Sequence, residues 1–148
     1  MTKAESKVID FIKKHILLFL LVAVTIIAIF LRVCGMDFQS DDFNSFLNSW
    51  WSIIKLNDFT GLATQVGNYN IPYQIIIYLM TLLPLNALYA YKIVSIIFDF
   101  VLAISTAMLA YSFAKNNRRL KAILTYSAVL LSATVIFNSS FWAQCDSI

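Results

Sequence analysis

The residues best suited to chemistry are two adjacent carboxylates, Asp41 and Asp42, which follow soon after a long apolar run. A carboxylate that is held in place can act as a general base and take the proton of an attacking hydroxyl. The position also has a structural explanation, because Ser40 can cap a helix and acids in its first turn gain about 0.3 to 1 kcal/mol each from the helix dipole. The two roles are compatible, since a capped helix start fixes the position of the carboxylate.

Asp99 and Lys92 form a second polar pair, within an apolar run. An ionised carboxylate inside a membrane span costs several kcal/mol, so such an acid normally faces a polar cavity or a partner. Lys92 lies two helical turns before Asp99, which puts both on one helix face. The pair could serve helix packing, or it could face a substrate, with Lys92 meeting a lipid phosphate as a point charge.

A third polar group lies in the closing segment "FWAQCDSI", which contains Trp142, Gln144 and Asp146. A tryptophan directly after a span is typical of an interfacial anchor. Oxygen ligands from Asp42 and Asp146 could hold Mg²⁺ or Mn²⁺, although no definite cofactor follows from the sequence. The only histidine, His15, is expected on the opposite side of the membrane.

The elements that must position these groups are membrane helices. The chain has 148 residues, of which 60% are hydrophobic and 13% charged, and its mean hydropathy is +0.77; these values argue against a soluble domain. Three apolar stretches, 16–33, 88–114 and 120–138, are near the roughly 17 to 25 residues that cross a bilayer. The first is expected to be a retained anchor, because no small-x-small cleavage site follows it. The predicted fold is an all-α integral membrane protein with three transmembrane helices.

The distribution of basic residues predicts the topology. If residues 72–85 crossed the membrane, the basic cluster at 115–121 would lie outside; if they do not, that cluster joins the four N-terminal lysines in the cytoplasm. The second arrangement places eight of the eleven Lys and Arg inside, as the positive-inside rule favours. We therefore expect a plasma-membrane protein with a cytoplasmic tail (1–15), a cytoplasmic loop (115–119), an outer loop (34–86) and an outer C-terminal segment (139–148).

Two surface helices are expected in the outer loop, at 41–56 and 72–85. In the first, apolar residues recur at helical spacing, which predicts an amphipathic helix lying on the outer leaflet. They are Phe43, Phe46, Leu47, Trp50, Trp51 and Ile54. The turn "GNYNIPY" separates the two helices, because the residue before Pro72 should be extended. The basic residues form no face suited to nucleic acid, so the expected partners are the bilayer and its lipids.

The order of these features resembles the N-terminal part of the GT-C membrane glycosyltransferases. The resemblance is carried by the acidic pair opening an amphipathic helix, a Tyr-Asn-x-Pro-Tyr turn at 69–73, the Lys and Asp of the next span, and an Asn-Ser-x-x-Trp-x-Gln-x-Asp-Ser ending at 138–147. The bacterial GPI mannosyltransferase-like group is the nearest match, and dolichol-phosphate-glucose-dependent glucosyltransferases are more distant. The likeness covers nearly the whole chain.

The resemblance implies roles for individual residues. "SDDF" is similar to the family's Ser-Gly-Asp-Tyr, which would make Asp42 the catalytic base and put Asp41 in the place of the glycine. Ile71 stands in the place of a first proline, and Ala143 in the place of a glycine. The implied substrate-binding residues are Asp41, Tyr69, Asn70, Lys92, Asp99, Trp142, Gln144 and Asp146.

The implied reaction transfers a hexose such as mannose from a polyprenyl-phosphate donor to a hydroxyl of a glycan, lipid or protein on the outer face, with inversion. Because members of the family are several times longer, the chain is expected to be an N-terminal fragment, inactive alone and associated with further spans or another membrane subunit. The alternative is a small non-catalytic multi-pass protein that acts as a partner subunit or assembly factor. In that alternative Asp42 only caps its helix, and Asp99 binds another span.

Overall fold

The computed structural model describes residues 3–144, which are built from helices and contain no strand. The all-α class is therefore confirmed for the described part of the chain. The elements in order are α1 (Lys3–Val33), the π-helical turn η1 (Phe43–Leu47), α2 (Asn48–Asn57), the 3-10 helix η2 (Asp58–Ala63), α3 (Ile71–Thr81), α4 (Ala87–Phe113), α5 (Arg118–Leu130), α6 (Ala133–Ile136) and the π-helical turn η3 (Phe137–Phe141).

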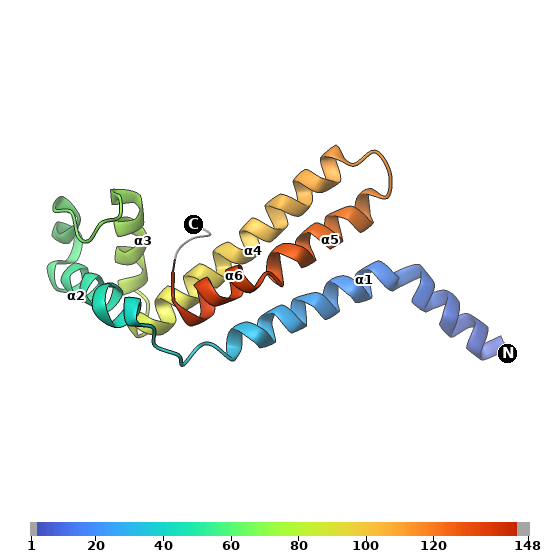
Figure 1. Ribbon diagram of the computed structural model, residues 1–148, viewed down its shortest axis with the longest axis horizontal. Coiled ribbons are helices and arrows are strands. Elements are labelled where there is room, and N and C mark those ends of the chain that lie inside the picture. The colour runs from blue at the N-terminus through green and yellow to red at the C-terminus, as the bar shows by residue number, and fades with distance from the viewer. Residues whose placement is uncertain (1–2, 145–148) are drawn as a thin grey trace.

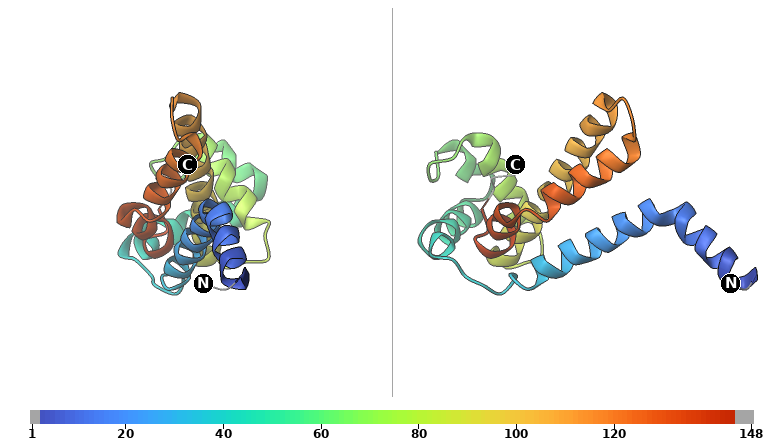
Figure 2. Two further views of the ribbon diagram at one scale, coloured as in Figure 1. Left: turned by 90° about the vertical axis from the view of Figure 1, so that its right-hand side faces the viewer. Right: turned by 45° about the vertical axis from the view of Figure 1, so that its right-hand side comes forward.

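The long helices lie side by side and the short ones gather at one end (Figure 1). α4 and α5 form an antiparallel hairpin, and α1 packs against α5. α2, α3 and α6 lie at one end of this bundle, whereas the α4–α5 turn and the start of α1 lie toward the other. Figure 2 shows that the N-terminal part of α1 diverges from the hairpin. The two ends of the bundle therefore carry different parts of the sequence.

Two described helices have the length and apolar character of membrane spans, Ala4–Val33 and Ala87–Phe113. The second agrees within one residue with the predicted span at 88–114. A third span exists if the bent pair Arg118–Leu130 and Ala133–Phe141 crosses as one unit. α3 has 11 residues, about 16 Å of helix against about 30 Å of hydrocarbon. It is too short to cross, as predicted, and it ends earlier than the expected residue 85.

The expected straight helix at 120–138 is broken, because its two halves meet at an angle of 51°. Ser132 adopts an extended conformation between α5 and α6. The break leaves the carbonyl of Leu130 without its usual helical donor, and the Nη1 group of Arg32 donates to it at 3.1 Å. An exposed carbonyl in a bilayer would cost several kcal/mol, so Arg32 stabilises the bend.

Arg32, rather than Lys92, is the partner of Asp99. Its Nε and Nη2 groups donate to Asp99 Oδ2 at 3.1 and 2.9 Å. Both side chains are almost completely buried, at 1% and 2% exposure. The helix-packing explanation of Asp99 is thus supported, with Arg32 as the partner, and its substrate-binding role stays a prediction.

Lys92 has a different structural role. Its ammonium group donates to the carbonyls of Gly35 at 2.7 Å and Met36 at 3.0 Å, and also to that of Phe38. Lys92 is fully buried. It therefore supplies donors to the irregular connection that follows α1, where, among the described residues, only the Gly35 carbonyl of these three also accepts a backbone N–H, that of Phe38. Its ammonium group is thus engaged by backbone carbonyls, and its predicted substrate contact stays a prediction.

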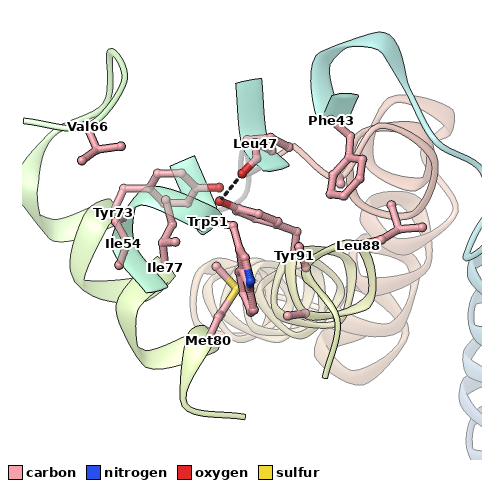
Figure 3. Packing of buried hydrophobic residues seen from close by; sticks show 13 residues of the cluster. Phe43, Leu47, Trp51, Ile54, Val66, Tyr73, Ile77, Met80, Leu88 and Tyr91 are labelled. Carbon is pink, nitrogen blue, oxygen red and sulfur yellow. Dashed lines mark hydrogen bonds between the residues drawn. The ribbon is translucent and has the colours of Figure 1, made fainter. Parts of the chain in front are cut away.

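The apolar face of the first loop helix packs on protein. Figure 3 shows Trp51 and Ile54 of α2 against Ile77 and Met80 of α3, with Tyr91 of α4 beside them. Trp51 is only 5% exposed. The helix was expected to rest on lipid through this face, but α3 and α4 cover much of it, while Phe46 of the same face stays exposed. A location at the membrane surface stays a prediction for both loop helices.

Candidate functional site

Ser40 begins the loop helix and also joins it to the C-terminal segment. Its hydroxyl oxygen accepts the backbone N–H of Phe43 at 3.1 Å, which is the predicted N-cap bond. The same hydroxyl donates to the carbonyl of Trp142 at 3.1 Å. Asp41 and Asp42 follow in the first helical turn, and both are exposed. The cap therefore holds the two carboxylates beside the residues that end the described chain.

Asp42 contacts that segment directly. The amide nitrogen of Gln144 donates to Asp42 Oδ2 at 2.7 Å. Within residues 3–144, Asp42 Oδ1 has no hydrogen-bond partner. The amide thus fixes one oxygen of the carboxylate and leaves the other to accept a proton or a hydroxyl group.

Asp42 and Gln144 stand at the edge of a cavity of about 470 Å³. This volume lies in the usual range of small-molecule sites. The walls are mainly aromatic, with polar groups at a few points. The lining residues are Asp42, Phe46, Leu47, Trp50, Gly67, Asn68, Tyr69, Tyr73 and Gln144.

The wall opposite η1 comes from the loop between η2 and α3. Gln74 is buried in α3, and its amide nitrogen donates to the carbonyl of Val66 at 3.0 Å, which ties the loop to the helix. Tyr69 then packs edge-on to Trp50, with ring centroids 5.5 Å apart, and against Tyr73 at 4.8 Å. These contacts form one aromatic wall from residues on α2, the loop and α3.

Gly67 lies against Trp50 in this wall. Its φ of +72° falls in the left-handed region, and a Cβ atom there would stand 2.3 Å from Cε2 of Trp50. Any side chain at position 67 would therefore displace the indole ring and strain the backbone.

Replacing Gly67 with alanine is expected to lower the free energy of unfolding by about 1 to 3 kcal/mol, the cost of a strained left-handed residue. It should also shift the tryptophan emission, because Trp50 must move. Gly61→Ala is the matched control: the nearest atom to its new Cβ, Asn57 Cβ, is 3.2 Å away, and its φ is not positive. Denaturation in detergent, followed by fluorescence, checks the difference; equal effects of the two variants would contradict it.

The structure gathers three of the predicted site residues, Asp42, Tyr69 and Gln144, in one cavity. Tyr73 of the "GNYNIPY" turn joins them, although no role was predicted for it. Phe46 and Trp50 were also missed as cavity residues. Their spacing of four on one helix face was a usable signal, whereas nothing local pointed to Gly67 or Asn68.

Other predicted residues lie apart from this cavity. Asn70 lines a separate space of about 240 Å³ beside the start of α3. Asp41 is exposed and does not line the main cavity, and Trp142 is 44% exposed and contributes only its carbonyl. Asp146 lies outside the described residues.

Ala143 adopts a left-handed conformation, with φ of +59°, and is completely buried. Glycine is the residue that takes this conformation without strain. The position is therefore one where the glycine suggested by the resemblance would fit the backbone better than the alanine present.

The described residues do not form a metal site by themselves, because residues 3–144 contain no group of three or more His, Cys, Asp or Glu that could hold an ion. The second acid considered for Mg²⁺ or Mn²⁺, Asp146, is not described. We derive no step through a metal.

Comparison with known proteins gives no match, whether to a family model, a curated protein or a solved structure. The function is therefore inferred from the geometry of the cavity, the chemistry of Asp42 and the resemblance in the sequence.

Proposed function

We propose that the chain supplies the general base and the sugar-binding pocket of a membrane glycosyltransferase. This enzyme would transfer a hexose from a polyprenyl-phosphate donor to an acceptor hydroxyl. The observation that carries this proposal is the position of Asp42. Its carboxylate stands at the edge of an aromatic cavity, with one oxygen fixed by Gln144 and the other without a partner among residues 3–144. The cavity lies at one end of a bundle of apolar helices, where a lipid-linked substrate would present its head group.

The cavity walls suit a sugar. Aromatic side chains offer large rigid surfaces for the apolar face of a pyranose ring, and their edges and hydroxyls add polar contacts. Trp50, Tyr69 and Tyr73 supply such surfaces, while Asn68 and Gln144 can hydrogen-bond sugar hydroxyls. An apolar site with a few placed polar groups is the usual design of a small-molecule pocket.

The proposed step is an inverting displacement. Asp42 Oδ1 takes the proton of the acceptor hydroxyl as its oxygen forms a bond to the anomeric carbon. The bond from that carbon to the phosphate oxygen breaks, and its electron pair leaves with the polyprenyl phosphate. Attack opposite the leaving group inverts the anomeric centre. A positioned general base contributes about 10²- to 10⁴-fold to such a rate.

Support for an outward-facing site comes from the opposite end of the bundle. Lys14 of α1 and Arg119 of α5, one residue from each basic cluster, line one shared cavity there, and the lining of that cavity does not include Asp42. Under the positive-inside rule that end is cytoplasmic, which turns Asp42 outward.

In this proposal, the buried cations Arg32 and Lys92 do not bind the donor phosphate. Arg32 binds Asp99 and Leu130, and Lys92 binds the connection after α1. We therefore assign the charge that offsets the leaving phosphate to groups beyond these two, on further spans or on another membrane subunit.

The direct test is a transfer assay in membranes. Membranes from cells that carry the gene, and from cells in which it is deleted, receive radiolabelled polyprenyl-phosphate hexoses. Transfer to an endogenous acceptor should require the gene and return when it is restored. Equal transfer in the deleted and restored membranes, across the hexoses supplied, would overturn the proposal.

A non-catalytic partner subunit is the second candidate, and one observation favours it. Ser40 and Asp42 both bind the C-terminal segment, so Asp42 already has a structural function in joining that segment to the loop helix. In that case the restored chain would support assembly of a partner equally well with Asp42→Asn.

A further inference from the structure

A second cavity, of about 500 Å³, lies between α1, α4 and α5, and its lining does not include the residues of the Asp42 site. Its walls are mainly aliphatic and aromatic. They include Leu21 and Thr25 of α1, Ile104 and Met108 of α4, and Ala122 and Tyr126 of α5.

The hydroxyls of Thr25, Ser112 and Tyr126 in these walls already have partners. The Thr25 hydroxyl donates to the carbonyl of Leu21 at 2.8 Å and lies 3.0 Å from the hydroxyl of Tyr126. The cavity therefore presents few free polar groups that could bind water. A hydrocarbon chain suits it better.

A neighbouring space of about 400 Å³ continues this cavity toward the basic end of the bundle. The two spaces share Leu21, Tyr111 and Ala122 as lining residues. The second space is also lined by Lys14 and His15 of α1 and by Arg119 of α5. An apolar crevice thus opens beside a lysine and an arginine that stand on different helices.

Within residues 3–144, neither of these two cations makes a hydrogen bond or an ion pair. Arg118, the neighbour of Arg119, instead donates to the carbonyl of Ala114 at 2.8 Å. Unpaired positive charges beside an apolar cavity are complementary to a ligand with an anionic head and a hydrocarbon tail.

We propose that this crevice binds an anionic phospholipid of the adjoining leaflet. The phosphate lies between Lys14 and Arg119, and one acyl chain lies along the cavity between α1, α4 and α5. Guanidinium groups match phosphate geometry with paired donors, and lysine adds a point charge. Basic pockets between transmembrane helices are known sites of this kind. The proposal does not depend on the role of Asp42.

The test measures lipid binding to the purified chain in detergent by native mass spectrometry, with phosphatidylglycerol and phosphatidylcholine as probes. Phosphatidylglycerol should bind more tightly. The double variant Lys14→Gln/Arg119→Gln should weaken its binding about 10- to 30-fold, the effect of two basic residues near a head group. Lys55→Gln removes one positive charge from α2, which lies at the other end of the bundle, and should leave binding unchanged.

A second variant tests the tail. Ala122 lines both spaces, so Ala122→Phe should fill their junction and weaken phosphatidylglycerol binding with both cations intact. Circular dichroism confirms that each variant remains folded, and a variant that does not is replaced by Met108→Trp, which fills the same cavity from α4. Equal affinity for the two lipids, or an equal loss of binding in the Lys55→Gln control, would overturn the proposal. The proposal would also be overturned if Ala122→Phe left binding unchanged while the charge variant weakened it, because the site would then bind a phosphate without a lipid chain.

Discussion

Asp42→Asn is expected to reduce hexose transfer by about 10²- to 10⁴-fold, the contribution of a positioned general base. Asparagine has nearly the same shape, but its amide cannot take the proton of the acceptor hydroxyl. Its oxygen can still accept the amide hydrogen that Gln144 now donates to Asp42, so the joint between η1 and the C-terminal segment should persist. The loss should therefore appear in the rate of transfer and not in folding.

Asp41→Asn is the matched control for this variant, because it removes the same charge one residue earlier. Asp41 is exposed and does not line the cavity, so transfer should stay close to the wild-type rate. The measurement is initial-rate transfer from a polyprenyl-phosphate hexose in membranes from the restored cells, with protein amounts equalised by immunoblot. Wild-type turnover by Asp42→Asn would remove the catalytic assignment and leave the joint as the role of this carboxylate.

Loss of either member of the Arg32–Asp99 pair is expected to lower the free energy of unfolding by about 3 to 5 kcal/mol, because it leaves an uncompensated buried charge. Arg32→Met removes the donors to Asp99 and to the Leu130 carbonyl together. Asp99→Leu leaves the guanidinium without its acid. Both variants should also loosen the bend between α5 and α6, since Arg32 binds at that break.

The double variant separates the effect of an unpaired buried charge from the effect of losing the hydrogen bond at the bend. Arg32→Met/Asp99→Leu contains no buried charge, so it should be much more stable than either single variant. It should still fall short of the wild type by about 1 to 3 kcal/mol, because the buried Leu130 carbonyl has lost its donor. Lys55→Met, at an exposed position of α2, is the control and should change stability by less than about 0.5 kcal/mol. Denaturant unfolding in detergent gives these values; additive losses in the double variant would contradict the argument.

The sequence by itself determined the long helices and the capped start of the helix that carries Asp42. Apolar runs of membrane length predicted α1 and α4, and the short proline-flanked segment was predicted not to cross. Ser40 was identified as a cap from its neighbours alone, and its bond to Phe43 is present. These features depend on hydropathy and on hydrogen bonding within a few residues, both of which are local. Asp42 and Gln144 were chosen as site residues with help from the resemblance, and their roles in catalysis stay predictions.

Only the tertiary structure decided which distant groups meet. It paired Asp99 with Arg32 instead of Lys92, turned Lys92 toward the connection after α1, and buried Trp51 under α3 and α4. It also bent the third apolar stretch and closed the aromatic cavity around Gly67. A helix shows which residues share a face, but not which helix that face will contact. That choice depends on how all the helices pack together, and so no short stretch of this sequence contains it.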